Sequence, residues 1–180
     1  MKKGNQKDRG IVMVYTGNGK GKTTAALGMA LRASGHGQKI KMIQFMKGSQ
    51  NYGEIKAAKK YIPNFEIEQF GLDKFVNKNN PAQEDIELAR KGFEEARKAI
   101  ISDEYDLIVL DEISVAVDYN LIKEEDVIKL IQSKPLRLNL VLTGRYASKK
   151  IVELADMVSE VREIKHHYKK GIKAKPGVEF

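Results

Sequence analysis

The segment from Thr16 to Thr24, TGNGKGKTT, constrains the fold of this chain more than any other stretch. An apolar run, IVMVY at 11–15, precedes it, and an Ala- and Leu-rich helical pattern follows it. A strand, a glycine-rich turn, a Lys-Thr pair and a helix form the layout of a phosphate-binding loop. Glycines allow tight turns with inward-pointing N–H groups, and the helix dipole adds positive charge there. The segment therefore predicts an α/β fold with a phosphate site after the first strand.

The spacing of this loop departs from the usual pattern, G-x-x-x-x-G-K-[ST]. With Gly21, Lys22 and Thr23 in register, the first glycine should stand at position 16, but the chain has Thr16 there and Gly17 comes one residue late. A glycine-rich turn without a ligand is the alternative. The flanking strand and helix favour phosphate binding by a modified loop.

The composition narrows the class of protein. A chain of 180 residues is long enough for one core, so we expect a single domain over residues 1–180. No apolar run approaches the ~20 residues of a membrane span, and no apolar segment follows the basic amino terminus as in a secretory signal. The chain has no cysteine, which excludes disulfides and thiolate chemistry. We therefore expect a cytoplasmic protein with no membrane partner.

The net charge of +8 is concentrated at the two ends of the chain. Residues 1–9 hold four Lys or Arg and one Asp, residues 161–180 hold six basic and two acidic residues, and the rest is nearly neutral. Basic terminal segments at 1–9 and 165–180 are usually solvated, and otherwise suit an anionic ligand or an acidic partner protein. Aromatic residues interleaved with basic ones are not evident, so we expect no nucleic-acid partner. The adjacent His166 and His167 are expected at the surface.

The rest of the chain alternates strand and helix patterns. Asn80 is predicted to cap the longest helix, with Pro81 at its first position. This alternation predicts a mostly parallel sheet flanked by helices on both faces. The predicted strands are 39–45, 65–70, 105–110, 136–142 and 157–164, and the predicted helices are 21–34, 53–61, 81–101, 123–132 and 148–155.

Charged residues follow three of the predicted strands, where open α/β sheets place ligand groups. Asp111 and Glu112 follow YDLIVL, and P-loop proteins hold Mg²⁺ with such carboxylates and the loop hydroxyl, here Thr23. Arg145 follows LRLNLVL and is suited to bidentate phosphate contact. Lys47 follows KIKMIQF. Solvated carboxylates and an exposed loop arginine are the alternatives.

These motifs predict a site for a nucleoside triphosphate and Mg²⁺, but they leave the reaction open. Phosphoryl transfer needs an acceptor or a water aligned behind the γ-phosphate. Attack on the ribose carbon would use the same cations to neutralise a leaving triphosphate. A kinase or ATPase, and a sensor that binds ATP without turning it over, therefore remain alternatives.

Several motifs in this order resemble the corrinoid adenosyltransferases of the CobA/BtuR/CobO type. They are TGNGKGKTTAA, GHG, QFMKG, VLDE, VLTGR and LADMVSEVREIKHHYKKGIKAKPGVEF, and the resemblance covers about residues 10–180. It implies a P-loop NTPase-like (RecA-like) fold. It also implies that Co(I) of a reduced corrinoid attacks the 5′ carbon of ATP and that triphosphate leaves, in adenosylcobalamin biosynthesis or salvage. No protein nucleophile is then needed, because cobalt supplies it.

The resemblance also assigns residues and partners. Lys22 and Arg145 would stabilise charge, and Thr23, Glu112 and Asp111 would hold Mg²⁺. Phe70 and Phe75 are possible corrinoid contacts, but equally core residues. A reducing flavoprotein and a homodimer are implied. The ATP-binding residues would be Gly17, Asn18, Gly19, Lys20, Gly21, Lys22, Thr23 and Thr24.

Two features of the family bear on the ligand sites of this chain. The family binds ATP with reversed polarity, the γ-phosphate taking the usual α-phosphate place, so the shifted glycine pattern would fit a shifted ligand. A longer amino-terminal segment helps to cover the corrinoid in some members, whereas about nine residues precede the first predicted strand here. The resemblance therefore implies a reduced lid, or a lid formed by another segment.

Overall fold

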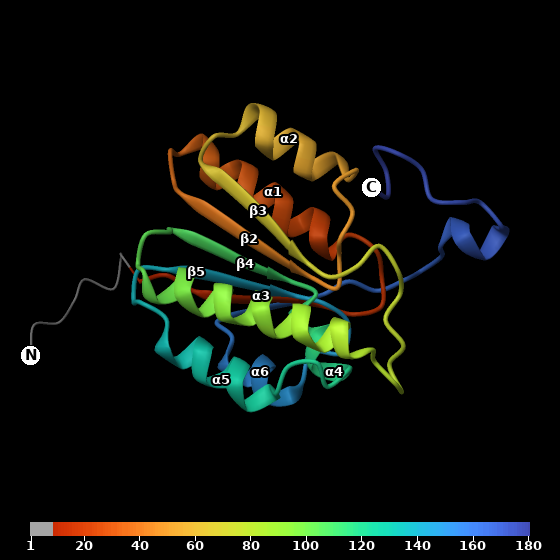
Figure 1. Ribbon diagram of the computed structural model, residues 1–180. Helices are drawn as coiled ribbons and strands as arrows, with labels where there is room; N and C mark the ends of the chain where they lie inside the picture. The colour runs from red at the N-terminus through yellow and green to blue at the C-terminus, as the bar shows by residue number, and fades with distance from the viewer. Residues whose placement is uncertain (1–8) are drawn as a thin grey trace, which may run out of the picture.

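The computed structural model describes residues 9–180, so most of the basic segment expected at 1–9 lies outside the described residues. Six strands form an all-parallel sheet in the order β3-β2-β4-β5-β1-β6 (Figure 1). The strands are β1 (Val12–Thr16), β2 (Ile40–Phe45), β3 (Phe65–Phe70), β4 (Leu107–Asp111), β5 (Asn139–Thr143) and β6 (Met157–Glu160). The helices are α1 (Lys22–Gly35), α2 (Gly53–Tyr61), α3 (Gln83–Ile101), α4 (Ile113–Asp118), α5 (Glu124–Ser133), α6 (Lys149–Leu154) and the 3₁₀ helix η2 (His167–Lys170).

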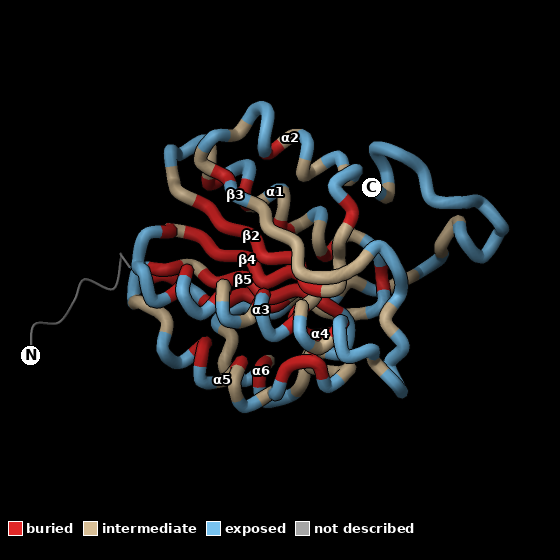
Figure 2. The backbone as a smooth tube through the Cα atoms, viewed as in Figure 1, coloured by how far each residue is buried: buried red, intermediate tan, exposed pale blue. Residues whose placement is uncertain are grey.

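Helices cover both faces of the sheet, with α1 and α2 on one face and α3 to α6 on the other (Figure 1). Side chains alternate along each strand, so Val12 and Val14 of β1 join the core with α3 and α5, whereas Met13 packs with α1. The central strands are buried on both faces (Figure 2), which explains their almost continuous apolar sequences. The predicted α/β fold with a parallel sheet between helical layers is confirmed.

Strand β5 separates the strand that leads into the glycine loop from the strand that ends in the two carboxylates. Val12 of β1 pairs with Leu140, and Leu107 of β4 pairs with Asn139. Because every strand runs in the same direction, the carboxyl ends of β1, β2, β4 and β5 meet at one edge. The loops that follow these strands can therefore build a common site.

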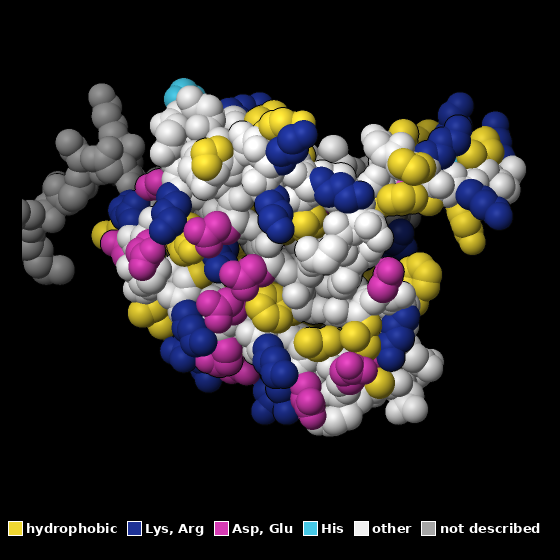
Figure 3. Space-filling model, turned by 45° about the horizontal axis from the view of Figure 1, so that its top comes forward, with side chains coloured by type: hydrophobic (Ala, Val, Ile, Leu, Met, Phe, Trp, Pro, Cys, Tyr) yellow, Lys and Arg dark blue, Asp and Glu magenta, His cyan; other side chains and the backbone are white. Residues whose placement is uncertain are grey.

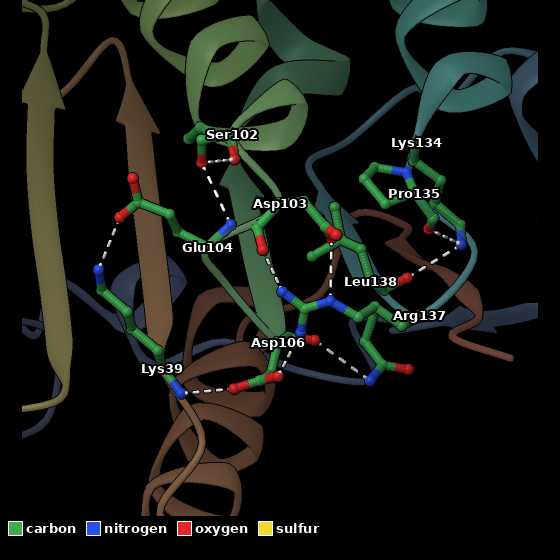
Figure 4. Close-up of polar contacts among 11 residues, drawn as sticks. Lys39, Ser102, Asp103, Glu104, Asp106, Lys134, Pro135, Arg137 and Leu138 are labelled. Atoms are coloured by element: carbon green, nitrogen blue, oxygen red, sulfur yellow. Dashed lines mark hydrogen bonds and ion pairs between the residues drawn. The ribbon is translucent and has the colours of Figure 1, made fainter. Parts of the chain in front are cut away.

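At the amino ends of the strands, away from the glycine loop, a network of charged side chains holds the sheet together (Figure 4). The Arg137 guanidinium pairs with the carboxylates of Asp103 at 2.9 Å and Asp106 at 2.7 Å. Asp106 also accepts a hydrogen bond from the Lys39 backbone N–H at 2.9 Å. Most of these groups are partly exposed, so each pair stabilises the fold by at most ~1 kcal/mol. The network ties together the amino ends of β2, β4 and β5, far from the glycine loop.

Helix α3 begins later than predicted. Ala82 is its N-cap, and the Asp85 side chain accepts a hydrogen bond from the Ala82 backbone N–H at 3.2 Å. The expected cap at Asn80 is therefore wrong, because an acidic side chain in the first turn satisfies a backbone donor that Asn80 was expected to serve. Within residues 9–180, no helix is both long enough and apolar enough to cross a membrane.

Other boundaries also shift. Helix α4 follows directly after β4 and was not predicted, because six residues are too few for a clear period. Strand β5 begins at Asn139 rather than 136, and β6 ends at Glu160 rather than 164. Residues 161–164 instead leave the sheet and run along the glycine loop.

Candidate nucleotide-binding site

A pocket of about 540 Å³ lies at the carboxyl edge of the sheet, where the glycine loop enters α1. Segments far apart in the chain form its walls, including the start of α2 and the carboxyl terminus, which lie close together in Figure 1. The position agrees with the rule that open α/β sheets bind ligands outside the carboxyl ends of their strands. The lining includes 18–24, 52–54 and 177–180, together with Lys47, Glu112 and Arg145.

The glycines of the loop serve two different needs. Gly21 has φ 114° and lies in open space just before α1, so its conformation suits a turn that faces a ligand. Gly17 and Gly19 instead pack against the chain after β6, where an added Cβ would lie 2.5 Å and 2.8 Å from the nearest backbone atoms. The Gly19 N–H also donates to the Val161 carbonyl at 2.7 Å. The shifted glycine pattern therefore also serves close packing within the protein.

Thr16 occupies the position where the usual loop has glycine. Its hydroxyl accepts a hydrogen bond from the Ala147 backbone N–H at 3.2 Å, and its carbonyl accepts one from the Val161 N–H at 2.8 Å. Thr16 thus connects β1 to both neighbouring loops. One of them carries Arg145, so the side chain that breaks the pattern helps to place a cation at the pocket.

The Lys22 side chain folds back over the glycine loop. Its ammonium donates to the carbonyls of Gly17 at 2.8 Å and Gly19 at 2.7 Å. Burial lowers the pKa of Lys22, and the positive charge of Arg145 lowers it further, against the attraction of Glu112 and Asp111. A phosphate in the loop would give this buried cation a charged partner in place of two carbonyl oxygens.

Asp111 is the buried centre of the site, with no exposed surface. Its Oδ1 accepts hydrogen bonds from the hydroxyls of Thr23 at 2.9 Å and Thr143 at 2.7 Å. Its Oδ2 accepts from the Gln44 amide at 3.2 Å and the Lys47 ammonium at 2.7 Å. A carboxylate offers about four acceptor positions, so these donors saturate it. Asp111, at the end of β4, therefore fixes the positions of α1, β5 and the end of β2 relative to one another.

Glu112 reaches the pocket from a strained backbone. Its φ is 62°, a left-handed conformation that costs about 1 kcal/mol or more for a non-glycine residue. The Glu112 N–H donates to the Thr143 hydroxyl oxygen at 3.0 Å, and this bond anchors the turn. Burial, followed by the negative charge of Asp111, raises the pKa of Glu112 above its usual value.

The donors around Thr23 fit a hard cation such as Mg²⁺. The Thr23 hydroxyl and the carboxylates of Asp111 and Glu112 are oxygen ligands, which Mg²⁺ prefers. The Lys47 ammonium lies 3.3 Å from Thr23 Oγ1 and 2.7 Å from Asp111, so a positive charge already stands between these groups. Across residues 9–180, no group of three or more His, Cys, Asp or Glu side chains could hold a metal. Thr23, Asp111 and Glu112 would hold Mg²⁺ jointly with phosphate oxygens, as in P-loop proteins.

Arg145 lines the pocket from the turn after β5. Its two neighbours have positive φ, 134° at Gly144 and 62° at Tyr146. Left-handed backbone at a non-glycine residue is characteristic of functional sites, and Met46 after β2 has it as well. Three strand ends at this edge therefore carry strained residues, with Glu112 at the third.

The carboxyl terminus forms the outer wall of the pocket. Its basic segment 165–180 was expected to be solvated, or otherwise to face an anionic ligand or an acidic partner protein. The Lys20 ammonium donates to the Val178 carbonyl at 2.7 Å and pairs with the Glu179 carboxylate at 2.6 Å. The Phe180 ring lies 6.4 Å from the Tyr52 ring at the start of α2. His166, expected at the surface, is half-buried and lines the pocket. The end of the chain thus returns to the glycine loop.

The structure brings most of the predicted site residues to this pocket. Lys22, Thr23, Glu112 and Arg145 line it, as do the other loop residues from 18 to 24. Gly17 lies outside the lining and contributes its carbonyl to Lys22 instead.

The two predicted corrinoid contacts lie in different environments. Phe70 packs against α3, where a Cβ on Gly92 would lie 2.8 Å from its side chain. Phe75 is fully exposed, at 103% of its reference surface. A core role therefore suits Phe70, whereas Phe75 is accessible to a ligand.

Other residues at the site had no predicted role. The sequence pattern puts Lys47 at a strand end without indicating its function, and it gives no role to Gln44, Tyr52 or Thr143. A polar residue inside an apolar strand, as in KIKMIQF, is the signal that could have identified Gln44, because a buried amide needs a partner. Tyr52 and the carboxyl-terminal residues carry no such local signal.

Comparison with known proteins identifies the family. The ATP:corrinoid adenosyltransferase BtuR/CobO/CobP family matches residues 8–180. A corrinoid adenosyltransferase of Escherichia coli (strain K12) is 36% identical over 175 residues, which cover 97% of this chain and 88% of that protein. The corrinoid adenosyltransferase CobA of Salmonella typhimurium is 35% identical over 97% of this chain and 88% of its own. A Pseudomonas aeruginosa relative is 36% identical over 96% and 85%. The chain belongs to the ATP:corrinoid adenosyltransferase BtuR/CobO/CobP family.

Proposed function

We propose that this protein transfers the 5′-deoxyadenosyl group of ATP to the Co(I) of a reduced corrinoid, in adenosylcobalamin biosynthesis or salvage. One observation carries the proposal: Lys22, Thr23, Glu112 and Arg145 line a single pocket beside the buried Asp111. Such a pocket combines cations for a triphosphate with oxygen donors for a divalent metal. Family membership supplies the second substrate, the corrinoid.

The reaction is a displacement at carbon. The Co(I) electron pair forms the cobalt–carbon bond at C5′, the bond from C5′ to its phosphate oxygen breaks, and that electron pair leaves with triphosphate. Negative charge grows on the leaving group, so Lys22 and Arg145 stabilise it most in the transition state. The protein otherwise binds and orients the two substrates and excludes water, because cobalt is the nucleophile.

Thr23 and Glu112 would hold Mg²⁺ beside the phosphates, with Asp111 next to them. The ion would supply charge neutralisation for the leaving triphosphate. The Thr23 hydroxyl donates its proton to Asp111, which leaves an oxygen lone pair directed away from that carboxylate. Asp111 is therefore suited to orient the ligands, and Glu112 to contact the ion.

We also propose that ATP lies in the loop with reversed polarity, the γ-phosphate near the first turn of α1 and the ribose toward solvent. The open space around Gly21 accommodates a phosphate there, and the packed Gly17 and Gly19 leave no such room on the β6 side. A nucleotide-bound structure tests this assignment. An α-phosphate at the loop, in the ordinary direction, would contradict it.

The proposal extends to the partners of the enzyme. Lysine and hydrophobic side chains gather on the carboxyl-terminal arm, residues 165–180 (Figure 3). Exposed residues of this arm include Lys169, Lys170, Lys173 and Tyr168. The positive charge of this arm suits docking of an acidic reducing flavoprotein. We also propose that the enzyme is a homodimer and acts in the cytoplasm. Docking through charge predicts that the rate with the natural reductant falls as ionic strength rises.

One assay tests the reaction. The protein is incubated with Mg-ATP and chemically reduced cobalamin, and triphosphate and adenosylated corrinoid are measured together. Equal amounts of the two products are expected. Formation of ADP without cobalt alkylation would indicate a kinase or ATPase, and binding of ATP without any product would indicate a sensor.

A further inference from the structure

Lys47 stands at the centre of the site and has no role in the reaction as described above. Its ammonium lies 2.7 Å from Asp111 Oδ2 and 3.3 Å from Thr23 Oγ1, and 19% of its side chain is exposed. Burial alone would lower the pKa of Lys47, but the charge and hydrogen bond of Asp111 raise it above the usual value. Lys47 is therefore a partly buried cation at the point where the metal is expected.

The backbone is built to place Lys47 there. Met46 has φ 59°, which turns the chain sharply at the end of β2. The next glycine, Gly48, packs against Gly71, and a Cβ on either residue would lie 2.4 Å from backbone atoms of the facing segment. A strained residue costs free energy and persists only where the surrounding structure holds it in place, as the close crossing of Gly48 and Gly71 does here.

The hydrogen bonds of Asp111 show what Lys47 supplies. Three neutral groups, the hydroxyls of Thr23 and Thr143 and the Gln44 amide, donate to this fully buried carboxylate. Lys47 is the one charged donor among its described partners. A buried carboxylate without a counter-charge is strongly unfavourable, so Lys47 neutralises Asp111 in the form without ligand.

The same position conflicts with a bound metal. The Thr23 hydroxyl donates its hydrogen bond to Asp111, and Lys47 donates to one of the two lone pairs on the Thr23 oxygen, so it competes with a metal for that oxygen. Two cations so close together repel, and a divalent cation replaces the charge that Asp111 needs. The side chain of Lys47 must then find another partner.

We propose that Lys47 is a resident cation with two positions: it holds Asp111 and Thr23 in the free enzyme, and it moves onto the phosphate chain when Mg²⁺ and triphosphate bind. Lys47 lines the pocket together with Lys22 and Arg145, and its flexible four-carbon stem allows the move without backbone change. The inference rests on the proposed function, because it assigns a further residue to the same triphosphate site.

Titration calorimetry with Mg²⁺ alone and with inorganic tripolyphosphate plus Mg²⁺ tests the proposal. Lys47→Met removes the charge and keeps the length of the side chain, Lys47→Arg keeps the charge, and Lys59→Met on exposed α2 is the matched control. For Lys47→Met we expect Mg²⁺ alone to bind at least tenfold more tightly, because the competing cation is gone. We expect tripolyphosphate to bind about tenfold more weakly, whereas Lys47→Arg and Lys59→Met bind it within twofold of wild type.

Wild-type behaviour in both titrations of Lys47→Met would overturn the role of Lys47, while tripolyphosphate binding to the wild type would still support the phosphate site. Absence of tripolyphosphate binding to the wild type would instead overturn the proposed function together with this inference. A crystal structure of the wild type with Mg²⁺ and tripolyphosphate tests the movement of Lys47 even if Lys47→Met does not fold. Lys47 within hydrogen-bond distance of a phosphate oxygen supports the proposal, and Lys47 still paired with Asp111 overturns it.

Discussion

The Thr16 hydroxyl accepts a hydrogen bond from the backbone N–H of Ala147 at 3.2 Å. This bond joins the end of β1 to the turn that carries Arg145, two residues before Ala147. The residue that departs from the usual loop pattern therefore connects two parts of the phosphate site. A glycine at position 16 would have no side chain to make this connection.

Replacement of Thr16 tests that connection. Thr16→Val keeps the shape but leaves the Ala147 N–H without its acceptor, so we expect a loss of about 1 kcal/mol in the free energy of unfolding. The turn with Arg145 should loosen, and the KM for ATP should rise several-fold. Urea unfolding and steady-state kinetics measure both effects. Thr16→Ser, which keeps the hydroxyl, should behave as wild type, and an unchanged Thr16→Val would contradict the positioning role.

Removal of the loop lysine should be severe. Lys22→Ala deletes a cation from a buried site that faces the leaving triphosphate, and loss of one such group costs about 10²- to 10³-fold in turnover. The exposed Lys59→Ala on α2 controls for loss of charge and should retain full activity. Triphosphate release under saturating corrinoid is the measurement. Near-normal turnover of a folded Lys22→Ala enzyme would count against the phosphate assignment.

The raised pKa of Glu112 predicts that metal binding depends on pH. Its raised pKa means that the carboxylate is still protonated at a pH where an exposed glutamate is ionised. Mg²⁺ needs the ionised form, so its affinity should increase as pH rises through this pKa. Calorimetric titrations of Mg²⁺ with tripolyphosphate over a pH series should show that increase in wild type. They should show weaker binding in Glu112→Gln, without the part of the pH dependence that Glu112 causes in wild type.

The same group affects stability with the opposite trend. Because its pKa is raised on folding, Glu112 contributes stability below the unfolded-state pKa, and this contribution is lost as pH rises through the folded-state pKa. Without metal, Glu112→Gln should therefore unfold at higher urea than wild type above that pKa. Glu125→Gln, at an exposed position of α5, should follow wild type throughout.

The carboxyl terminus should compete with phosphate for Lys20. The hydrogen bond from Lys20 lowers the pKa of Glu179, which is thus ionised and holds the lysine in the pocket wall. Glu179→Gln keeps the side-chain shape but removes the competing charge, so tripolyphosphate should bind about two- to fivefold more tightly, as for a partly exposed pair. Glu153→Gln on α6 is the control. Weaker binding by Glu179→Gln would show that Glu179 supports the site rather than competes.

The two phenylalanines should separate a core role from a ligand role. Phe70→Ala leaves a gap against Gly92 and should lower the free energy of unfolding by about 3 kcal/mol. Phe75→Ala removes a fully exposed ring and should leave stability unchanged. A rise in the KM for corrinoid in Phe75→Ala, with the KM for ATP unchanged, would support a corrinoid contact there. An unchanged corrinoid KM would exclude one.

Much of the fold was predictable because its signals are local. The alternating strands and helices, the glycine loop and the carboxylates after β4 each depend on neighbouring residues in the chain. The predicted helix cap at Asn80 was wrong because the side chain of Asp85, in the first turn of α3, accepts the hydrogen bond from the Ala82 backbone N–H. Helix α4 was missed because six residues show no clear period.

The chemical groups of the site are already written in the sequence: a glycine turn, the cation of Lys22, and oxygen donors after an apolar strand. How these groups meet depends on the three-dimensional arrangement of the strands. The strand order places β5 between β1 and β4, so Thr143 reaches Asp111, and Lys47 reaches it from β2 on the other side. The carboxyl terminus returns to Lys20 across almost the whole chain. Such contacts join residues far apart in sequence, so no local pattern encodes them, and packing alone selects them.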